Sequence, residues 1–186
     1  MQNTYIKPVV IFAVLAILMA ATRSHHFGSM LSLPDASWPI FLLAGFYLPR
    51  WVFPVLLVEA GLVDYWAISY GGVSDWCFSA AYWFLIPTYF SLWFGGRYYV
   101  TRHQFSWRSL AELAGIASIA TSVAFVISNA SFYLFADYFG ELSAAQYGAQ
   151  VAQYFLPYLQ TMMMYLAVAA LLHIAVLQIT KRSVVA

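Results

Sequence analysis

Charged side chains are scarce in this sequence. Asp, Glu, Lys and Arg make up only 8% of its 186 residues, whereas 63% are hydrophobic. A typical soluble domain carries about 25% charged residues, so this chain has too few charges to cover a surface that faces water. The composition predicts an all-α integral membrane protein, with residues 1–186 forming a single transmembrane domain.

Several other features are missing as well. The eight Lys and Arg residues are offset by seven Asp and Glu residues and form no basic cluster, which argues against nucleic acid as a partner. There is no Gly-rich loop ending in Lys-Ser or Lys-Thr, so the sequence has no ATP site of that type. Cys77 is the only cysteine, which excludes an internal disulfide and a zinc site of the usual Cys/His spacing.

Uncharged apolar runs are abundant, and each marks an expected membrane helix. The six runs are Pro8 to Thr22, about Trp38 to Leu48, Trp51 to about Ile68, Phe78 to Gly95, about Glu112 to Phe135, and about Ala149 to Ile179, the last with room for a kink at Pro157. We expect the first run to be a retained membrane helix rather than a cleaved signal peptide. The second run is short. Runs two and three could instead form one broken helix around Pro49, which would leave five crossings.

The distribution of basic residues favours six crossings over five. With six, the N-terminus, the second and fourth loops and the C-terminus lie on one side of the membrane. That side then holds seven of the eight basic residues: Lys7, Arg50, Arg97, Arg102, Arg108, Lys181 and Arg182. Only Arg23 lies on the other side. The positive-inside rule therefore predicts that both termini are cytoplasmic.

Cys77 lies at the expected outer end of the fourth helix. Ser74 or Asp75 is a suitable N-cap, which would put Cys77 in the first helical turn, where backbone N–H groups and the helix dipole favour a thiolate. The nearby charge of Asp75 opposes this by raising the pKa of the thiol. The alternative is that Cys77 is an inert, small hydrophobic residue.

Other candidate residues lie near the same outer side. His25 and His26 could form a polar wall or ligate a metal, or they could simply anchor the chain at the interface. Glu59 and Asp64 interrupt the third run, and charges within membrane segments usually serve a function. Asp64 is near the outer end, whereas Glu59 is deeper and could pair with Arg50.

Two further patterns have structural explanations. Met162, Met163 and Met164 are consecutive on a helix and cannot share one face, so core packing and lipid contact explain them better than metal binding. Ala16 and Ala20, four residues apart on the first helix, form a small-residue stripe that lets another helix approach closely.

Together these features resemble a known family. The stretches "TRSHHFGSMLSLPDASWPIFLLAGFYLPRW" and "VDYWAISYGGVSDWCFSAAYW" look like the BtuM family, the solitary cobalamin-specific S-components of energy-coupling factor (ECF) transporters in proteobacteria. The resemblance covers most of the chain. It implies a multi-pass protein of the bacterial inner membrane that binds cobalamin, or a related corrinoid, near the outer surface.

The resemblance also implies roles for particular residues. Cys77 would ligate the cobalt of the bound corrinoid and support removal of cyanide from cyanocobalamin. His25, Asp64 and Tyr82 match polar positions of the family's binding region. Ala16 and Ala20 would contact the transmembrane subunit of an ECF coupling module, whose ATPases would supply energy.

Two other functions compete with this interpretation. A membrane thiol enzyme of the exosortase type would need Cys, His and Arg on one outward face, which Cys77, His25 and Arg23 could supply. A membrane subunit without chemistry would need no reactive residue at all. The sequence leaves open the roles of Glu59, Gln150 and His26.

Overall fold

The computed structural model describes residues 8–23, 33–74, 79–140 and 142–185, with the backbone alone described for 180–185. These residues form six α-helices and one short 3₁₀ helix, and no strand occurs among them. In chain order they are α1 (Pro8–Thr22), α2 (Ser37–Tyr47), α3 (Val52–Tyr70), η2 (Ala80–Phe84), α4 (Leu85–Val100), α5 (Trp107–Phe135) and α6 (Ala144–Val185). The all-helical class predicted from the sequence is confirmed.

Three of the described helices are long and apolar enough to cross a membrane: α3, α5 and the Ala144–Ile179 part of α6. These helices support the prediction of a membrane protein. The apolar helices α1 and α2 are shorter, with 15 and 11 residues. At 1.5 Å per residue α2 covers about 17 Å, roughly half of the hydrocarbon core. The number of crossings therefore stays a prediction.

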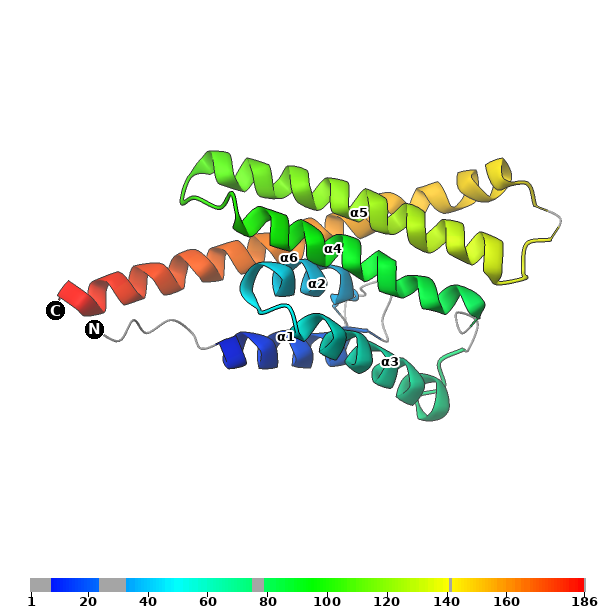
Figure 1. Cartoon of the computed structure of the whole chain (residues 1–186), viewed down its shortest axis with the longest axis horizontal. Helices are drawn as coiled ribbons and strands as arrows, with labels where there is room; N and C mark the ends of the chain where they lie inside the picture. Colours follow the sequence, from blue (N-terminus) through cyan, green and yellow to red (C-terminus); the bar gives the residue numbers. More distant parts are fainter. Residues whose placement is uncertain (1–7, 24–32, 75–78, 141, 186) are drawn as a thin grey trace.

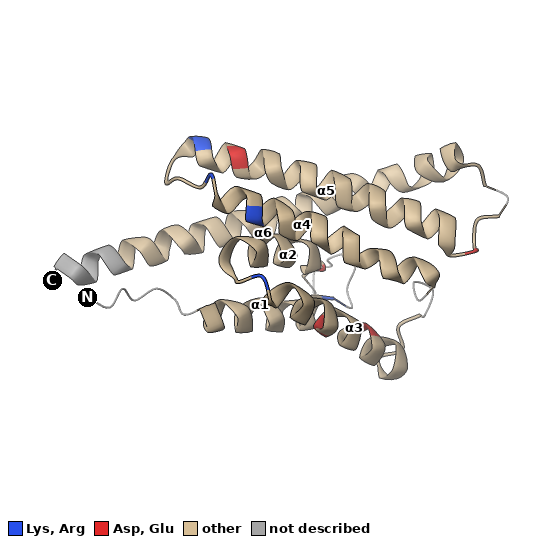
Figure 2. Ribbon diagram, in the orientation of Figure 1, with Lys and Arg blue, Asp and Glu red and all other residues tan. Residues whose placement is uncertain are grey.

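The helices run roughly along the long axis of the molecule, and successive helices alternate in direction (Figure 1). The start of α1 and the end of α6 consequently point toward the same end. Most of the coloured Lys and Arg residues lie in the half of the molecule nearest that end (Figure 2). This arrangement is compatible with six crossings and with both termini on the basic side.

The alternative in which runs two and three form one broken helix is wrong. The chain leaves α2 at Leu48, which has an extended conformation (φ −116°, ψ 156°). Pro49 follows, and a proline disfavours the helical conformation for the residue before it. The chain then turns, and α3 starts at Val52 and runs in the direction opposite to α2 (Figure 1).

Helix α2 forms the centre of the fold. Most of its residues are buried, as expected for a helix that is apolar on all sides. Two glycines let α2 and α4 touch: a Cβ atom on Gly45 would collide with the carbonyl oxygen of Trp93, and one on Gly96 with that of Leu42. Nearer the other end of α2, the Phe41 ring stacks on the Tyr89 ring of α4, with the centroids 4.2 Å apart.

Several predicted boundaries shift. Helix α1 spans Pro8–Thr22 as predicted. Helix α4 starts at Leu85, later than the predicted Phe78, and it is preceded by the 3₁₀ helix η2, which Ser79 caps. The cap expected at Ser74 or Asp75 stays a prediction, because residues 75–78 lie outside the described part of the chain. Helix α5 starts earlier than Glu112, at Trp107, because the Ser106 side chain accepts a hydrogen bond from the Ser109 backbone N–H and caps it.

Helix α6 is longer than predicted at both ends, and it continues through Pro157. Met162 is fully buried, whereas Met164 is 41% exposed. Met162 and Met164 therefore face different surroundings, which confirms that the three methionines do not share one face of the helix.

Candidate functional site

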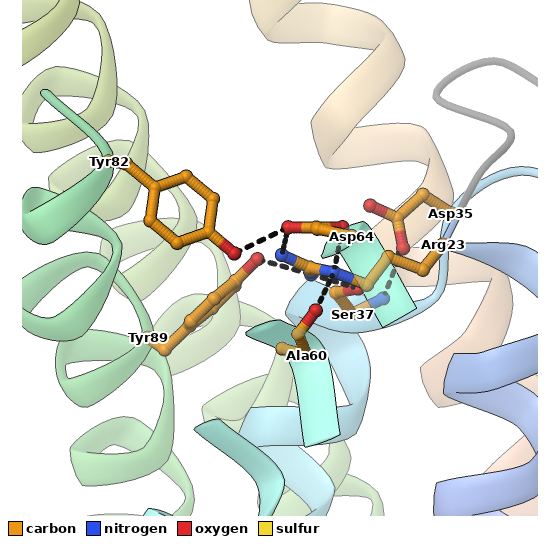
Figure 3. Close-up of polar contacts among 7 residues, drawn as sticks. All are labelled: Arg23, Asp35, Ser37, Ala60, Asp64, Tyr82 and Tyr89. Carbon is orange, nitrogen blue, oxygen red and sulfur yellow. Dashed lines mark hydrogen bonds and ion pairs between the residues drawn. The ribbon is translucent and has the colours of Figure 1, made fainter. Parts of the chain in front are cut away.

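An ion pair between Arg23 and Asp64 lies at the centre of the candidate site (Figure 3). Arg23 follows the last residue of α1, and Asp64 projects from α3. The guanidinium binds the carboxylate with two parallel hydrogen bonds, Nε to Oδ1 and Nη2 to Oδ2, both 2.7 Å long. The Arg23 residue is only 5% exposed, and the Asp64 side chain is 23% exposed. Such bidentate, charge-assisted contacts are among the strongest in proteins.

Arg23 also donates to groups on three helices. Nη1 donates to the Tyr89 hydroxyl (2.6 Å) and to Ser37 Oγ (2.9 Å), and Nε also approaches the Ala60 carbonyl oxygen (3.2 Å). These partners lie on α4, α2 and α3. The guanidinium therefore connects the end of α1 to the three helices that surround it.

Asp35 extends the network beyond Arg23. Its Oδ1 atom accepts hydrogen bonds from the Ser37 backbone N–H (2.8 Å) and the Ser37 hydroxyl (2.6 Å), at the start of α2. Burial by itself would lower the pKa of Arg23, but Tyr89, Asp64 and Asp35 outweigh that effect and raise the pKa above its ordinary value. Arg23 thus stays charged in its buried position.

Tyr82 joins the same carboxylate from the other side. Its hydroxyl donates to Asp64 Oδ2 over 2.7 Å. The tyrosine belongs to η2, which Ser79 orients by accepting a hydrogen bond from the Ala81 backbone N–H. Asp64 and Tyr82, two residues predicted to share a binding region, are therefore in direct contact.

A cavity of about 230 Å³ lies beside this network. Arg23, Asp64 and Tyr82 line one part of it, and Ser128 and Asn129 of α5 supply further polar groups. Its remaining lining residues are Asp35, Trp38, Ala81, Leu85, Tyr89, Ser131, Phe132 and Tyr158. The cavity thus combines one ion pair, the Asp35 carboxylate, several neutral hydrogen-bonding groups and aromatic rings.

Cys77, His25 and His26 lie outside the described residues. The first described helical segment after Cys77 begins at Ala80. The placement of Cys77 in a first helical turn, where the helix dipole would favour a thiolate, therefore stays a prediction.

Sequence reasoning found Asp64 but not its partner. Arg23 was the single basic residue on an otherwise acidic side, and Asp64 was a charge within a membrane segment. Together these two signals could have identified the pair, because buried charges require partners. Pairing of Glu59 with Arg50 was one possibility, and the structure does not show it: Arg50 is exposed, and no ion pair joins these two described residues.

The predicted docking residues Ala16 and Ala20 lie at the lateral surface of the helix bundle. Ala20 is exposed and Ala16 is partly buried. Larger apolar residues flank them on the same helix, including Val14 (57% exposed) and Ile17 (69% exposed). This surface of α1 is available to lipid or to another helix.

No protein-family model matches this chain, and no curated protein matches it at a significant level. Within the described part of the chain, no group of three or more His, Cys, Asp or Glu side chains is placed to hold a metal ion. The structure itself defines an all-helical protein with three helices able to cross a membrane and a buried ion pair beside a polar cavity.

Proposed function

We propose that this protein binds cobalamin or a related corrinoid and takes part in its uptake across the bacterial inner membrane. The proposal combines the resemblance to cobalamin-specific S-components with the polar cavity next to Arg23 and Asp64. In this proposal the chain crosses the membrane six times, both termini are cytoplasmic, and the cavity opens toward the outer side.

The observation that carries the proposal is the contact of Tyr82 with the Arg23–Asp64 pair at the edge of a cavity. Removing two charges from water costs several kcal/mol per ion, and such a pair is seldom more stabilising than well-packed apolar residues. Charges held at this price within membrane segments therefore usually serve a function. Here they present a carboxylate and a phenol to the cavity.

The size of the cavity limits how a corrinoid would bind. Pockets that enclose drug-sized ligands measure about 300–1,000 Å³, and the cavity, at about 230 Å³, is smaller. A whole corrinoid would not enter it. One peripheral amide arm would fit, with hydrogen bonds to Asp64, Tyr82 or Asn129, while the flat ring would lie outside against the loops.

In the proposal Cys77 binds cobalt. Thiolate sulfur is a soft ligand suited to a transition metal. The Cys77 thiolate would donate an electron pair to cobalt in exchange for a ligand that leaves with the electron pair of its own bond to the metal, and cyanide would leave in the same way as an anion. Neither step requires an oxidant or a reductant. His25 would contribute to the same outer region.

Energy for transport would come from a separate ECF coupling module. Its transmembrane subunit would dock on the Ala16 and Ala20 surface of α1, where small side chains allow close approach. The exposure of Ala20 and the partial exposure of Ala16 support this assignment.

The thiol-enzyme alternative is less well supported. It requires Arg23 to face a reacting group together with Cys77 and His25. The guanidinium instead donates to Asp64, Tyr89 and Ser37, and the residue is 5% exposed. An arginine bound in this way cannot also stabilise a developing charge at an outer site without breaking the network.

Equilibrium binding of cyanocobalamin to the purified protein tests the proposal. Tyr82→Phe removes one hydroxyl that donates to Asp64, and we expect it to weaken binding about tenfold. Tyr98→Phe is the matched control, because Tyr98 is 42% exposed and lies outside the residues lining the cavity. Absence of binding to the unmodified protein would refute the proposal, and equal affinities of the two variants would refute the assigned site.

A further inference from the structure

A second cavity lies at the opposite end of α2. Its volume is about 360 Å³, larger than that of the first cavity. Ser37 of α2 belongs to the Arg23 network, whereas Tyr47, ten residues later, lines the second cavity. A helix rises about 15 Å over ten residues, so the two cavities are separate sites. The second cavity also involves the connection between α4 and α5 and the middle of α6.

Two histidines line this second cavity, and a tyrosine holds each of them. The Nδ1 atom of His173 is 3.0 Å from the Tyr47 hydroxyl, and the Nδ1 atom of His103 is 3.0 Å from the Tyr99 hydroxyl. Ser109 anchors Tyr99 in turn, with its carbonyl oxygen 3.1 Å and its Oγ atom 2.9 Å from the Tyr99 hydroxyl. The orientation of both imidazoles is therefore fixed.

Both imidazoles keep one nitrogen available. Among the described residues, no hydrogen bond involves the Nε2 atom of His103 or of His173. The two rings are perpendicular (89°), and their centroids are 5.7 Å apart. Neutral imidazole either donates or accepts at Nε2, depending on its tautomer. The pair can therefore offer two hydrogen bonds to one small molecule.

The lining of the cavity restricts what that molecule can be. Among the described residues, no Asp, Glu, Lys or Arg lines the cavity, which favours a neutral ligand. Zinc sites use at least three protein ligands, and the described lining of the cavity offers no third His, Cys, Asp or Glu beside the two histidines, which favours an organic ligand over a metal ion. The remaining wall is mostly aliphatic and aromatic, including Phe46, whose ring centroid is 5.1 Å from that of His103.

The location of the cavity indicates how a ligand would enter. One wall is formed by Leu166, Ala169 and Ala170 of α6, a helix apolar enough to cross a membrane. Phe105 and Trp107 also line the cavity, and they are 67% and 87% exposed. Exposed aromatic residues of this kind are typical of the boundary between lipid and water. A lipid-soluble molecule could therefore reach the histidines from the membrane.

We propose that this second cavity binds a neutral, lipid-soluble ring compound that carries carbonyl or hydroxyl groups, of which a quinone is the simplest example. A flat ring packs against the aromatic wall, and its oxygen atoms form hydrogen bonds with His103 and His173. The volume falls within the range of about 300–1,000 Å³ that is usual for small-molecule sites. The proposal is independent of corrinoid binding at the first cavity.

Titration calorimetry of the detergent-solubilised protein with a short-chain benzoquinone tests this proposal. Replacing both histidines with phenylalanine (His103→Phe and His173→Phe) keeps an aromatic ring at each position but removes the nitrogen atoms. We expect at least about tenfold weaker binding. Tyr47→Phe, which removes only the hydroxyl that orients His173, should weaken binding by a smaller factor and is less disruptive to folding.

Two controls test whether the quinone binds at the second cavity and whether the binding is specific. Tyr82→Phe alters the first cavity only and should bind the benzoquinone as the unmodified protein does. An aliphatic alcohol of similar size should bind more weakly than the quinone. If the alcohol binds as tightly as the quinone, the cavity binds apolar molecules without specificity and the proposal is wrong. The proposal is also wrong if the Tyr47→Phe variant and the double histidine variant both keep full affinity for the quinone.

Discussion

Neutralising Asp64 should be among the most damaging single changes in this protein. Asp64→Asn preserves the shape of the side chain and one acceptor oxygen, but it removes the negative charge opposite Arg23. The guanidinium would remain buried, at 5% exposure, without a counterion. Breaking a buried pair by removing one partner destabilises a protein by about 3–5 kcal/mol. For a chain of this size that corresponds to a melting temperature lower by about 6–20 °C.

The chain contains a natural control for this prediction. Arg108 and Glu112 form an ion pair one turn apart on α5, with an N–O distance of 3.5 Å and side-chain exposures of 90% and 34%. Because exposed pairs at this spacing contribute about 0.5 kcal/mol or less, Arg108→Gln should change the melting temperature by no more than about 2 °C. Both variants are compared with the unmodified protein by thermal unfolding in one detergent.

A double substitution separates charge from packing. Arg23→Met combined with Asp64→Leu replaces the pair with apolar side chains, and such exchanges are often neutral or stabilising. We expect the double variant to be more stable than Asp64→Asn alone. If Asp64→Asn instead unfolds at the same temperature as Arg108→Gln, the inference that Arg23 depends on Asp64 is wrong.

Three further predictions concern packing, topology and the carboxylate. Gly45→Ala should destabilise the protein by about 3 kcal/mol or more, because the added carbon collides with the Trp93 carbonyl oxygen. Its control is Gly115→Ala, where no atom lies within 4 Å of the added carbon, and which should be neutral or stabilising by up to about 1 kcal/mol. Equal thermal stability of the two variants would contradict the α2–α4 contact. A fluorescent protein fused after Ala186 should fluoresce in the cytoplasm, and alkaline phosphatase inserted after Gly140 should be active; the reverse pattern would refute the six-crossing topology. Tyr82→Phe should lower stability by about 1.5–3 kcal/mol, since its hydroxyl donates to a charged group; unfolding identical to that of Tyr98→Phe would argue against this bond.

The helices were largely predictable from the sequence because hydrophobic runs and charges mark membrane segments. Helix α1 was predicted over its full described length. The errors arose where capping, rather than hydropathy, sets the boundary. Ser79 caps η2, although it lies inside the uncharged run that predicted the fourth helix. Ser106 caps α5, although it lies before the run that predicted the fifth helix.

The candidate site was predicted only in part. Asp64 stood out because it is a charge within an apolar run, and the resemblance pointed to Tyr82. The contributions of Ser37, Tyr89 and the Ala60 carbonyl could not be predicted, because they depend on how α2 and α4 pack around Arg23. The second cavity was missed because His103 and His173 are seventy residues apart and meet only in the folded chain.

The visible absorption spectrum of the purified protein mixed with cyanocobalamin is the decisive measurement for the proposed function. If the Cys77 thiolate replaces a ligand of cobalt, the bands of bound cyanocobalamin shift and free cyanide is released. The Cys77→Ala variant should then leave the spectrum of cyanocobalamin unchanged. A spectrum that does not change with the unmodified protein, or that shifts equally with Cys77→Ala, would contradict the proposed function of the cysteine.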